Sequence, residues 1–287
     1  MLSLDNCVIL LNKPCGHSSH EISAFVKKIT GATRTGHAGT LDPEVSGVLP
    51  VALGKATKLI QYIAGKDKTY VGIIKFKNPQ TKGQIEKLFM QFTGTITQTP
   101  PKISAVRKVP RERTIHSLKL LEISKDNPRL ALFEAKVDAG TYIRTLCNDI
   151  GKKCGGARME ELRRIAVGDI SERQCHTMQE LIDAVWLMKN KNDSSTLNSI
   201  LHAPEKFITF KKVLIKESAL KSVLSGAQVM VPAVECFPEK IEKGERVVLY
   251  CEKVFVGVGI AALNKKGFTS KRSGLAVKLE RIHKPKH

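Results

Sequence analysis

The spacing of apolar side chains along the chain predicts three amphipathic helices. Each follows a capping box, in which a Ser or Thr stands three positions before a Glu or Gln, and each continues with apolar residues on one helical face. Gly31 and Gly94 mark the ends of the first two helices, because glycine commonly terminates a helix. The capping boxes are Ser18 with Glu21, Thr81 with Gln84, and Thr177 with Glu180.

Runs rich in β-branched and aromatic residues between these helices predict strands. The clearest runs cover residues 70–76, 115–123 and 130–139, and the turn-like segment SKDNPR separates the last two. A further helical stripe begins at Ile143, soon after Gly140 ends the third run. This alternation of helices and strands predicts a mixed α+β domain.

The last third of the chain has a different pattern. Residues 189–199, KNKNDSSTLNS, are polar and poor in helix formers, so they are interpreted as a linker. Beyond about residue 207, short apolar strands recur with turns such as EKGE and NKKG between them, which indicates a small β-barrel. We therefore predict one domain over residues 1–206 and a second over residues 207–287. The barrel strands are VLIK, QVMVP, RVVLYC, VFVGVGIAAL and GLAVKLERI.

The charge balance indicates a folded protein that faces a polyanion. The chain has 47 Lys and Arg against 27 Asp and Glu, a formal charge of +20, while 42% of its residues are hydrophobic. Residues 207–287 carry 16 basic and 7 acidic residues, which is +9 of that total. Nucleic acid is the leading partner. The alternative for the barrel is a charged surface that only keeps the protein soluble.

An acidic membrane ranks second as a partner. The longest apolar runs, such as residues 48–53 and 254–263, are far too short to span a bilayer, and the N-terminus has no signal-peptide pattern. Seven scattered cysteines form no C-x-x-C pair, which fits neither a disulfide framework nor a zinc ribbon. We expect a soluble intracellular protein with reduced thiols in its core.

The stretch GHAGTLDPEVSGVLP, residues 36–50, is unusual in its density of glycine around one aspartate, Asp42. Asp-Pro alone is a common turn or helix cap, and that structural reading leads when the dipeptide is taken by itself. The neighbouring glycines favour a functional role for Asp42 instead, because they permit backbone geometry that allows a ligand to approach closely. They are Gly36, Gly39 and Gly47.

A second unusual segment is AGTYIRTLCNDIG, residues 139–151, which brings Tyr142 and Arg144 to a strand-to-helix junction. An arginine in this place can pair with a carboxylate and favour its ionised form. An ordinary structural salt bridge is an equal alternative on these residues alone.

Six motifs follow one another along the chain: LNKPCGHSSHEI, GHAGTLDPEVSGVLPVALGKATKL, KTYVGIIKF, TPPKISAVR, AGTYIRTLCNDIG and MEELRRIAVG. In this order they resemble the motifs of TruB-type pseudouridine synthases. Within that family, the alanine of GHAGTLDP, the short segment VRKVPRERTIHS and a barrel similar to a PUA domain resemble the dyskerin-like branch, whose members use guide RNA. The resemblance implies an α+β catalytic domain with a mixed, largely antiparallel sheet, and a C-terminal PUA-like domain.

The resemblance also implies roles for residues of the catalytic domain. Asp42 is the catalytic carboxylate that isomerises uridine in RNA to pseudouridine; attack as a nucleophile and removal of the C2′ proton are both open. Arg144 holds that carboxylate charged and aimed, and Tyr70 stacks on the extruded uracil and handles its C5 proton. The remaining roles are a pocket wall for Tyr142 and Leu162, a wedge in the vacated base stack for His37, and a brace for the catalytic loop for Lys13.

Basic residues are expected to line a groove for the substrate backbone. They are Arg107, Arg163 and Arg164, with Lys108, Arg111 and Arg113; the alternative for each is an ordinary solvated charge. Gly257 and Gly259 of the barrel are expected to let RNA approach closely. No motif for a nucleotide cofactor or a metal is present, so we expect none to be needed.

The expected partners are guide RNA, an rRNA or tRNA substrate, and small H/ACA accessory proteins, with no membrane. Because a long N-terminal extension and a lysine-rich tail are missing, an archaeal-type cytoplasmic protein is favoured, and a nucleolar one if the source is eukaryotic. The main hypothesis is a guide-dependent synthase acting on rRNA. Two alternatives are a stand-alone enzyme for the tRNA TΨC arm and a non-catalytic RNA-binding assembly factor.

Overall fold

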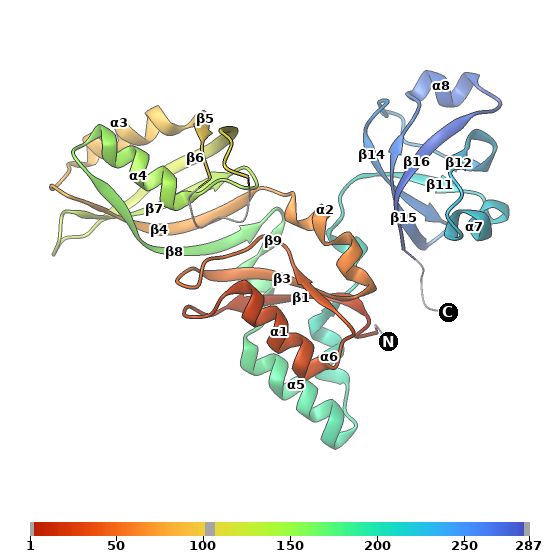
Figure 1. Cartoon of the computed structure of the whole chain (residues 1–287), viewed down its shortest axis with the longest axis horizontal. Coiled ribbons are helices and arrows are strands. Elements are labelled where there is room, and N and C mark those ends of the chain that lie inside the picture. Colours follow the sequence, from red (N-terminus) through yellow and green to blue (C-terminus); the bar gives the residue numbers. More distant parts are fainter. Residues whose placement is uncertain (1–2, 101–106, 284–287) are drawn as a thin grey trace. The chain divides into compact units, whose positions relative to one another are not determined.

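A computed structural model describes residues 3–100 and 107–283, so residues 1–2, 101–106 and 284–287 lie outside the description. The chain divides into two compact units, Met1–His202 and Ala203–His287, each taken by itself below (Figure 1). The expected boundary was residue 206. No helix within the described residues is long and apolar enough to cross a membrane.

The first unit is built on one ten-stranded sheet. Its main path runs β10-β1-β3-β8-β4-β7-β6-β5, with β2 added beside β3 and β9 beside β8. Every pairing is antiparallel except that of β3 with β8. The strands are β1 (Asn6–Lys13), β2 (Thr35–His37), β3 (Ser46–Gly54), β4 (Lys68–Phe76), β5 (Gly94–Gln98), β6 (Arg111–Ile123), β7 (Leu130–Val137), β8 (Ala157–Val167), β9 (Ile170–Ser171) and β10 (Leu201–His202).

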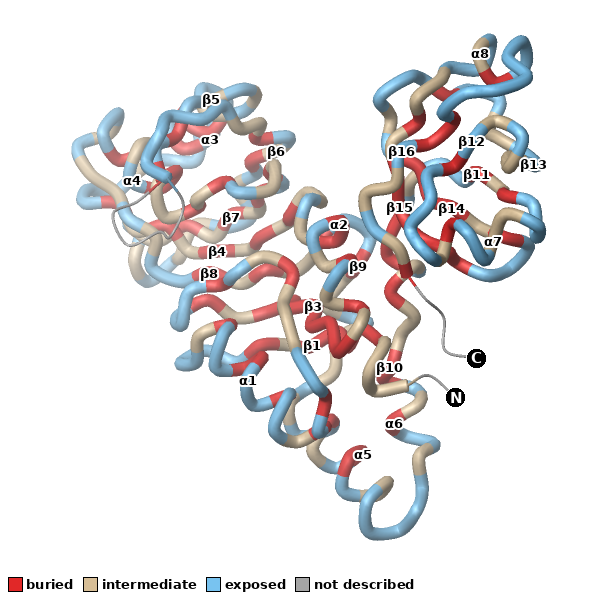
Figure 2. Tube along the Cα trace, turned by 45° about the vertical axis from the view of Figure 1, so that its right-hand side comes forward, coloured by how far each residue is buried: buried red, intermediate tan, exposed pale blue. Residues whose placement is uncertain are grey.

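Two groups of helices cover different parts of this sheet. Helices α3 and α4 pack their apolar faces on β4, β6 and β7, whereas α1, α5 and α6 pack on β1 and β3 (Figure 1). Because β1 and β3 are buried along most of their length, they read as nearly continuous apolar runs (Figure 2). The helices are α1 (Ser19–Thr30), α2 (Ile60–Ala64), α3 (Lys82–Phe92), α4 (Ile143–Lys153), α5 (Met178–Lys191) and α6 (Ser195–Ile200), with 3-10 turns η1 (Lys55–Leu59) and η2 (Glu172–Gln174).

The second unit is a six-stranded sheet with the order β12-β16-β15-β14-β11-β13, wrapped around its own apolar core. Only β11 and β14 run parallel. Its elements are β11 (Lys211–Ile215), β12 (Val229–Met230), β13 (Val234–Cys236), β14 (Arg246–Cys251), β15 (Val254–Ala261), β16 (Leu275–Ile282), α7 (Glu217–Leu224), α8 (Lys265–Ser270), η3 (Pro204–Phe207) and η4 (Val231–Ala233).

The predicted helices and strands are confirmed. All three capping boxes form in α1, α3 and α5, and Gly31 ends α1 in the left-handed conformation. All five strand segments of the second unit are present, together with β13, α7 and α8, which the strand pattern did not predict. The mixed α+β fold with a largely antiparallel sheet is therefore established.

Two predictions about the chain's organisation are wrong. Residues 189–199 are not a linker: α5 continues to Lys191, and α6 buries Leu197 and Ile200 in the core of the first unit. The thiols are free, but not all lie in a core, since Cys15 and Cys236 are exposed.

Gly257 and Gly259 of the second unit lie against strand β16. A Cβ added at these positions would lie 2.2 Å from the Arg281 carbonyl oxygen and 2.5 Å from Val277 Cγ1, respectively.

Candidate active site

The loop that carries Asp42, residues 38–45, is anchored in an apolar core on both sides of the aspartate. Leu41 and Val45 are each 3% exposed and belong to the same buried cluster as Tyr70, Leu162 and Ile143. The core that holds this loop, which we call the Asp42 loop, therefore also holds residues of three other motifs that are far apart in sequence. Asp42 itself is exposed rather than buried.

Hydrogen bonds from α1 and β1 fix the backbone of the Asp42 loop. The Ser19 hydroxyl donates to the Leu41 carbonyl at 3.0 Å and accepts from the Leu41 N–H at 2.8 Å. The Lys13 side chain is fully buried and donates to the carbonyl oxygens of Pro43, Pro14 and His17. Lys13 is therefore buried and hydrogen-bonded to the Pro43 carbonyl of the loop, and its role as a brace stays a prediction.

The side chains of Asp42 and Arg144 meet as the two motifs suggested. Arg144 Nη2 lies 3.0 Å from Asp42 Oδ2 and 3.2 Å from Glu44 Oε2, so one nitrogen bridges two carboxylates. Burial opposes the charge of Arg144, but hydrogen bonds and the charges of Asp42 and Glu44 more than offset it and raise its pKa. All three side chains are at least 42% exposed, so the cluster is open to a substrate.

Tyr70 and Leu162 belong to the core cluster that also holds Leu41 and Val45 of the Asp42 loop. Tyr70 is 8% exposed and Leu162 is 9% exposed. Leu162 and Phe133 fill the space above Gly72, where an added Cβ would lie 2.8 Å from Leu162 Cδ1. Both side chains are therefore buried in the core, and their roles in the site stay predictions.

His37 ends β2, directly before the Asp42 loop. Its Nδ1 lies 3.0 Å from the Ser23 hydroxyl oxygen and its Nε2 lies 3.2 Å from that of Thr40. Its ring also contacts His20 edge-on, with centroids 4.8 Å apart. The imidazole is therefore held by local polar partners in this structure.

The environment of His37 predicts stability that falls in acid. Burial, followed by the charges of His20 and Arg164, lowers the pKa of His37 from its ordinary value of 6.5 to about 4. The unfolded chain then binds this proton at higher pH than the folded chain, so the free energy of unfolding is retained above about pH 6.5 and falls as pH drops toward about 4. Urea unfolding across this window measures the slope. We expect His37→Gln to flatten it, and an unchanged slope would contradict the prediction.

Tyr142 caps α4 and lines a small cavity of about 50 Å³. The Gln98 amide holds the Tyr142 backbone by two hydrogen bonds, accepting from its N–H at 3.0 Å and donating to its carbonyl at 3.2 Å. Asp42 is not among the residues that line this cavity. The lining residues are Gln98, Pro100, Arg111, Arg113, Gly140 and Tyr142.

The arginines expected in a groove have different environments. Arg164 is 1% exposed, so the prediction that it lines a surface groove is wrong; alternation along β8 turns it into the core. Arg163, its neighbour, is partly exposed and pairs with Glu172 at 2.7 Å. Arg107 is exposed next to the undescribed residues 101–106, on which much of the TPPKISAVR motif falls.

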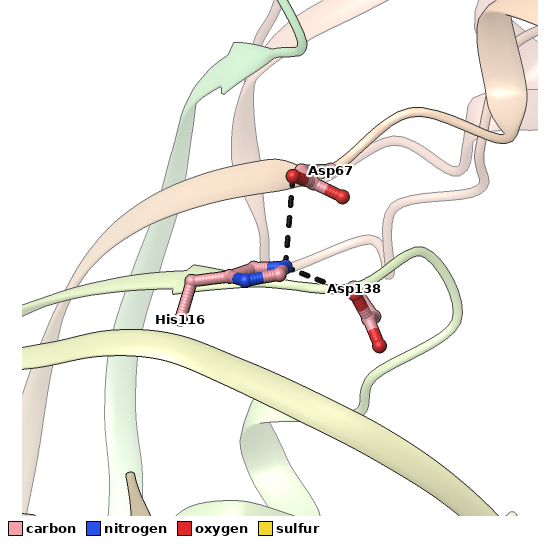
Figure 3. A group of neighbouring side chains, drawn as sticks. All are labelled: Asp67, His116 and Asp138. Carbon is pink, nitrogen blue, oxygen red and sulfur yellow. Dashed lines mark hydrogen bonds and ion pairs between the residues drawn. The ribbon is translucent and has the colours of Figure 1, made fainter. Parts of the chain in front are cut away.

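One group of side chains in the described residues brings metal-binding atoms together, although the sequence spacing did not indicate it. His116 Nε2 lies 2.9 Å from Asp138 Oδ1 and 3.5 Å from Asp67 Oδ2 (Figure 3). The Asp138 carboxylate also accepts a hydrogen bond from the Thr114 N–H at 2.7 Å. The His116 imidazole is hydrogen-bonded to Asp138 and lies within ion-pair distance of Asp67, and in the described part of the chain Asp42 is not a member of this group.

Three residues of the site were missed in the sequence. Glu44 shares Arg144 with Asp42, Gln98 fixes Tyr142, and Lys68 is a buried lysine beside Gly39. Burial, then the charge of Arg164, lowers the pKa of Lys68 to about 8. A second carboxylate only two positions after Asp42 could have indicated Glu44 from the sequence. The positions of Gln98 and Lys68 depend on contacts that only the fold creates.

Comparison with known proteins gives a consistent family. Residues 27–143 match the TruB family pseudouridylate synthase N-terminal domain, residues 144–209 the tRNA pseudouridylate synthase B C-terminal domain, and residues 211–283 the PUA domain. A probable tRNA pseudouridine synthase B of Pyrobaculum aerophilum is 37% identical over 96% of this chain and 83% of its own length. The H/ACA ribonucleoprotein complex subunit CBF5 of Emericella nidulans is 40% identical over 97% of this chain, which spans 59% of that relative.

Solved structures agree. A crystal structure of a Cbf5-Nop10-Gar1 complex contains a chain with a TM-score of 0.89 and 36% identity, covering 97% of this chain and 85% of that one. An H/ACA RNP bound to a substrate RNA containing 2′-deoxyuridine gives a TM-score of 0.88 at 34% identity, with coverage of 98% and 86%. On its domains, its relatives and its fold, the chain belongs to the TruB family of pseudouridine synthases.

Proposed function

We propose that Asp42 carries out the isomerisation of uridine to pseudouridine in RNA, with Arg144 and Tyr70 as its partners. The observation that carries this proposal is the 3.0 Å contact between Arg144 and Asp42, because it joins two motifs that are 102 positions apart at an open surface. The anchored backbone of the Asp42 loop supports it further, since a catalytic group must be held within a fraction of an ångström of its working position.

The chemistry requires an ionised carboxylate beside the ribose. The bond from N1 to C1′ breaks, the uracil turns, and C5 bonds to C1′. The C5 proton is removed by Tyr70 or solvent and N1 gains a proton, so the product is an isomer of uridine. Asp42 serves this either by attack as a nucleophile or by removal of the C2′ proton. Arg144 keeps the carboxylate charged and aimed, Tyr70 stacks on the extruded base, and Tyr142 and Leu162 form the apolar wall.

The remaining residues have supporting roles. His37 wedges into the space that the extruded base leaves, since extrusion costs roughly a few kcal/mol of lost stacking. Lys13 braces the loop from beneath. Arg163 and Arg107 contact the phosphates of the substrate.

We further propose that the chain acts as the catalytic subunit of an H/ACA guide-RNA particle on rRNA. Its similarity to the H/ACA ribonucleoprotein complex subunit CBF5, and to chains in the structures of a Cbf5-Nop10-Gar1 complex and of an H/ACA RNP bound to a substrate RNA, supports this assignment. The proposed partners are a guide RNA and small accessory proteins. In an archaeal cell the particle is cytoplasmic, and in a eukaryotic cell nucleolar.

Reconstitution tests guide dependence. The chain is incubated with a uridine-containing RNA alone, then with guide RNA, then with guide RNA and accessory proteins, and pseudouridine is mapped in each mixture. We expect conversion at the guided uridine only in the mixtures that contain guide. Full conversion of that uridine without guide would refute guide dependence while leaving the isomerase assignment intact.

Action on the tRNA TΨC arm without a guide is the second candidate. It is favoured by relatives that are named as probable tRNA pseudouridine synthases, among them the protein of Pyrobaculum aerophilum. Conversion of a tRNA transcript by the isolated chain separates it from the first candidate.

The exposed basic segment that follows the undescribed residues is expected to contribute to RNA affinity through charge. Arg107 and Lys108 are both exposed. Each phosphate contact that is lost reduces the slope of log binding constant against log salt concentration by about 0.7 for a single strand. Titrations with Lys108→Gln measure this slope, and Lys125→Gln, on an exposed turn, is the matched control. Equal slopes for the two variants would remove Lys108 from the interface.

A further inference from the structure

Arg164 is the largest fully buried side chain among the described residues, and its hydrogen-bond acceptors are neutral oxygens. Its Nε donates to the Val48 carbonyl at 2.8 Å, and its Nη2 donates to the Gly39 carbonyl at 2.9 Å. Burial lowers the pKa of Arg164, while a side-chain hydrogen bond with Tyr70 opposes that shift. A guanidinium remains charged in such a site, so these oxygens offset its desolvation.

The backbone around Arg164 is shaped to deliver this side chain. The register of β4 against β8 shifts between Thr69 and Tyr70, so that Tyr70 pairs with Arg164 across a bulge. On the other side Gly47 of β3 lies so close that an added Cβ would be 2.1 Å from the Arg164 carbonyl oxygen. Bulges of this kind re-aim a side chain. Here the side chain reaches from β8 toward the Asp42 loop.

The acceptors of Arg164 come from three segments of the chain. Gly39 is in the Asp42 loop, three positions before the aspartate, and Val48 is in β3, just beyond the loop's other end. Tyr70 is on β4. One planar guanidinium therefore ties both flanks of the loop to the strand that carries Tyr70. We call this set of four residues the Arg164 clamp.

We propose that Arg164 is a positioning residue, which holds Asp42 and Tyr70 in the relative geometry that the isomerisation needs. This inference rests on the proposed function of those two residues. Arg164 itself is too deeply buried to touch RNA, so it acts through the loop. Its removal therefore slows turnover and leaves RNA affinity in place.

Arg164→Lys tests the clamp, because lysine keeps the charge but cannot supply the rigid fork that reaches several oxygens at once. A misplacement of about 1 Å at a reacting centre costs roughly 10²-fold in rate. We expect single-turnover pseudouridine formation to fall by about that factor, while the dissociation constant for substrate RNA changes by less than about threefold. Arg158→Lys, an exposed arginine on the same strand that pairs with Glu160, is the matched control.

A second measurement on the full-length protein does not depend on activity. Hydrogen–deuterium exchange in peptides covering residues 36–50 is expected to be faster in Arg164→Lys than in Arg158→Lys, with the other peptides of the first unit unchanged. If the lysine variant does not fold, as judged by thermal unfolding, Arg164→Gln takes its place, since a neutral amide can donate to one carbonyl without a buried charge.

The outcomes separate the clamp from the proposed function. Unchanged turnover and unchanged exchange in the Asp42 loop would overturn the positioning role, as would a loss confined to RNA affinity. Faster exchange in the loop, in a protein whose unaltered form makes no pseudouridine under any condition, would support the clamp and refute the proposed function.

Discussion

Asp42→Asn is expected to abolish pseudouridine formation while RNA binding survives. The substitution keeps the size of the side chain but removes the ionised oxygen that either mechanism needs, so the rate should fall by about 10⁴-fold. Affinity should not weaken, because the change removes a negative charge from a surface that faces phosphates. Single-turnover conversion of a radiolabelled RNA and filter binding to the same RNA measure the two quantities.

Glu44→Gln is the matched control for that experiment. Glu44 lies two residues away, is exposed, and shares the same arginine nitrogen at 3.2 Å. Its loss should reduce the rate by less than about tenfold, since an exposed ion pair contributes only about 0–1 kcal/mol. If Glu44→Gln were inactive and Asp42→Asn active, the catalytic carboxylate would be Glu44. If Asp42→Asn lost RNA binding, its proposed role would be wrong.

The features that could be predicted from the sequence are those determined locally. Ser18, Thr81 and Thr177 each begin a helix, because a capping box satisfies backbone N–H groups within four residues. Residues 189–199 were wrongly predicted to be a linker, because their structure depends on distant parts of the chain. Their composition is polar, but Leu197 and Ile200 gain their meaning only from the sheet face on which α6 packs.

Arg163 and Arg164 show most clearly what the sequence could not predict about the site. They are identical neighbours in the motif MEELRRIAVG, and both were expected at a surface groove. Strand alternation requires that they point to opposite faces, but the sequence does not state which one faces the core. The bulge opposite Tyr70 and the close approach of Gly47 decide it, and both depend on strands far away in the chain.

The glycines in the sequence also predicted only part of the structure. A glycine run correctly indicates close backbone approach, yet it does not identify what approaches. At Gly257 the neighbour is the paired strand β16, and at Gly39 it is the guanidinium of Arg164, 3.2 Å from the position of an added Cβ. The pairing of Asp42 with Arg144 could be predicted. An arginine favours the ionised form of a carboxylate, and the family resemblance assigned the two motifs that carry these residues to one active site.

Arg144→Met is expected to lower the rate of pseudouridine formation by roughly 10²- to 10³-fold, the range found when one electrostatic contact at a reacting centre is removed. Without the guanidinium, the carboxylates of Asp42 and Glu44 face each other unneutralised, and Asp42 loses the contact that aims it. Single-turnover rates measure the loss.

The double variant Arg144→Met with Glu44→Gln separates these two causes. Two unit charges about 4 Å apart in water interact by about 1 kcal/mol, so removing the Glu44 charge should restore the rate severalfold if repulsion contributes. The remaining deficit then measures the loss of aim. A rate within about threefold of the unaltered protein for Arg144→Met alone would mean that the 3.0 Å contact is an ordinary surface salt bridge, and the proposal that Arg144 serves the catalytic carboxylate would fail.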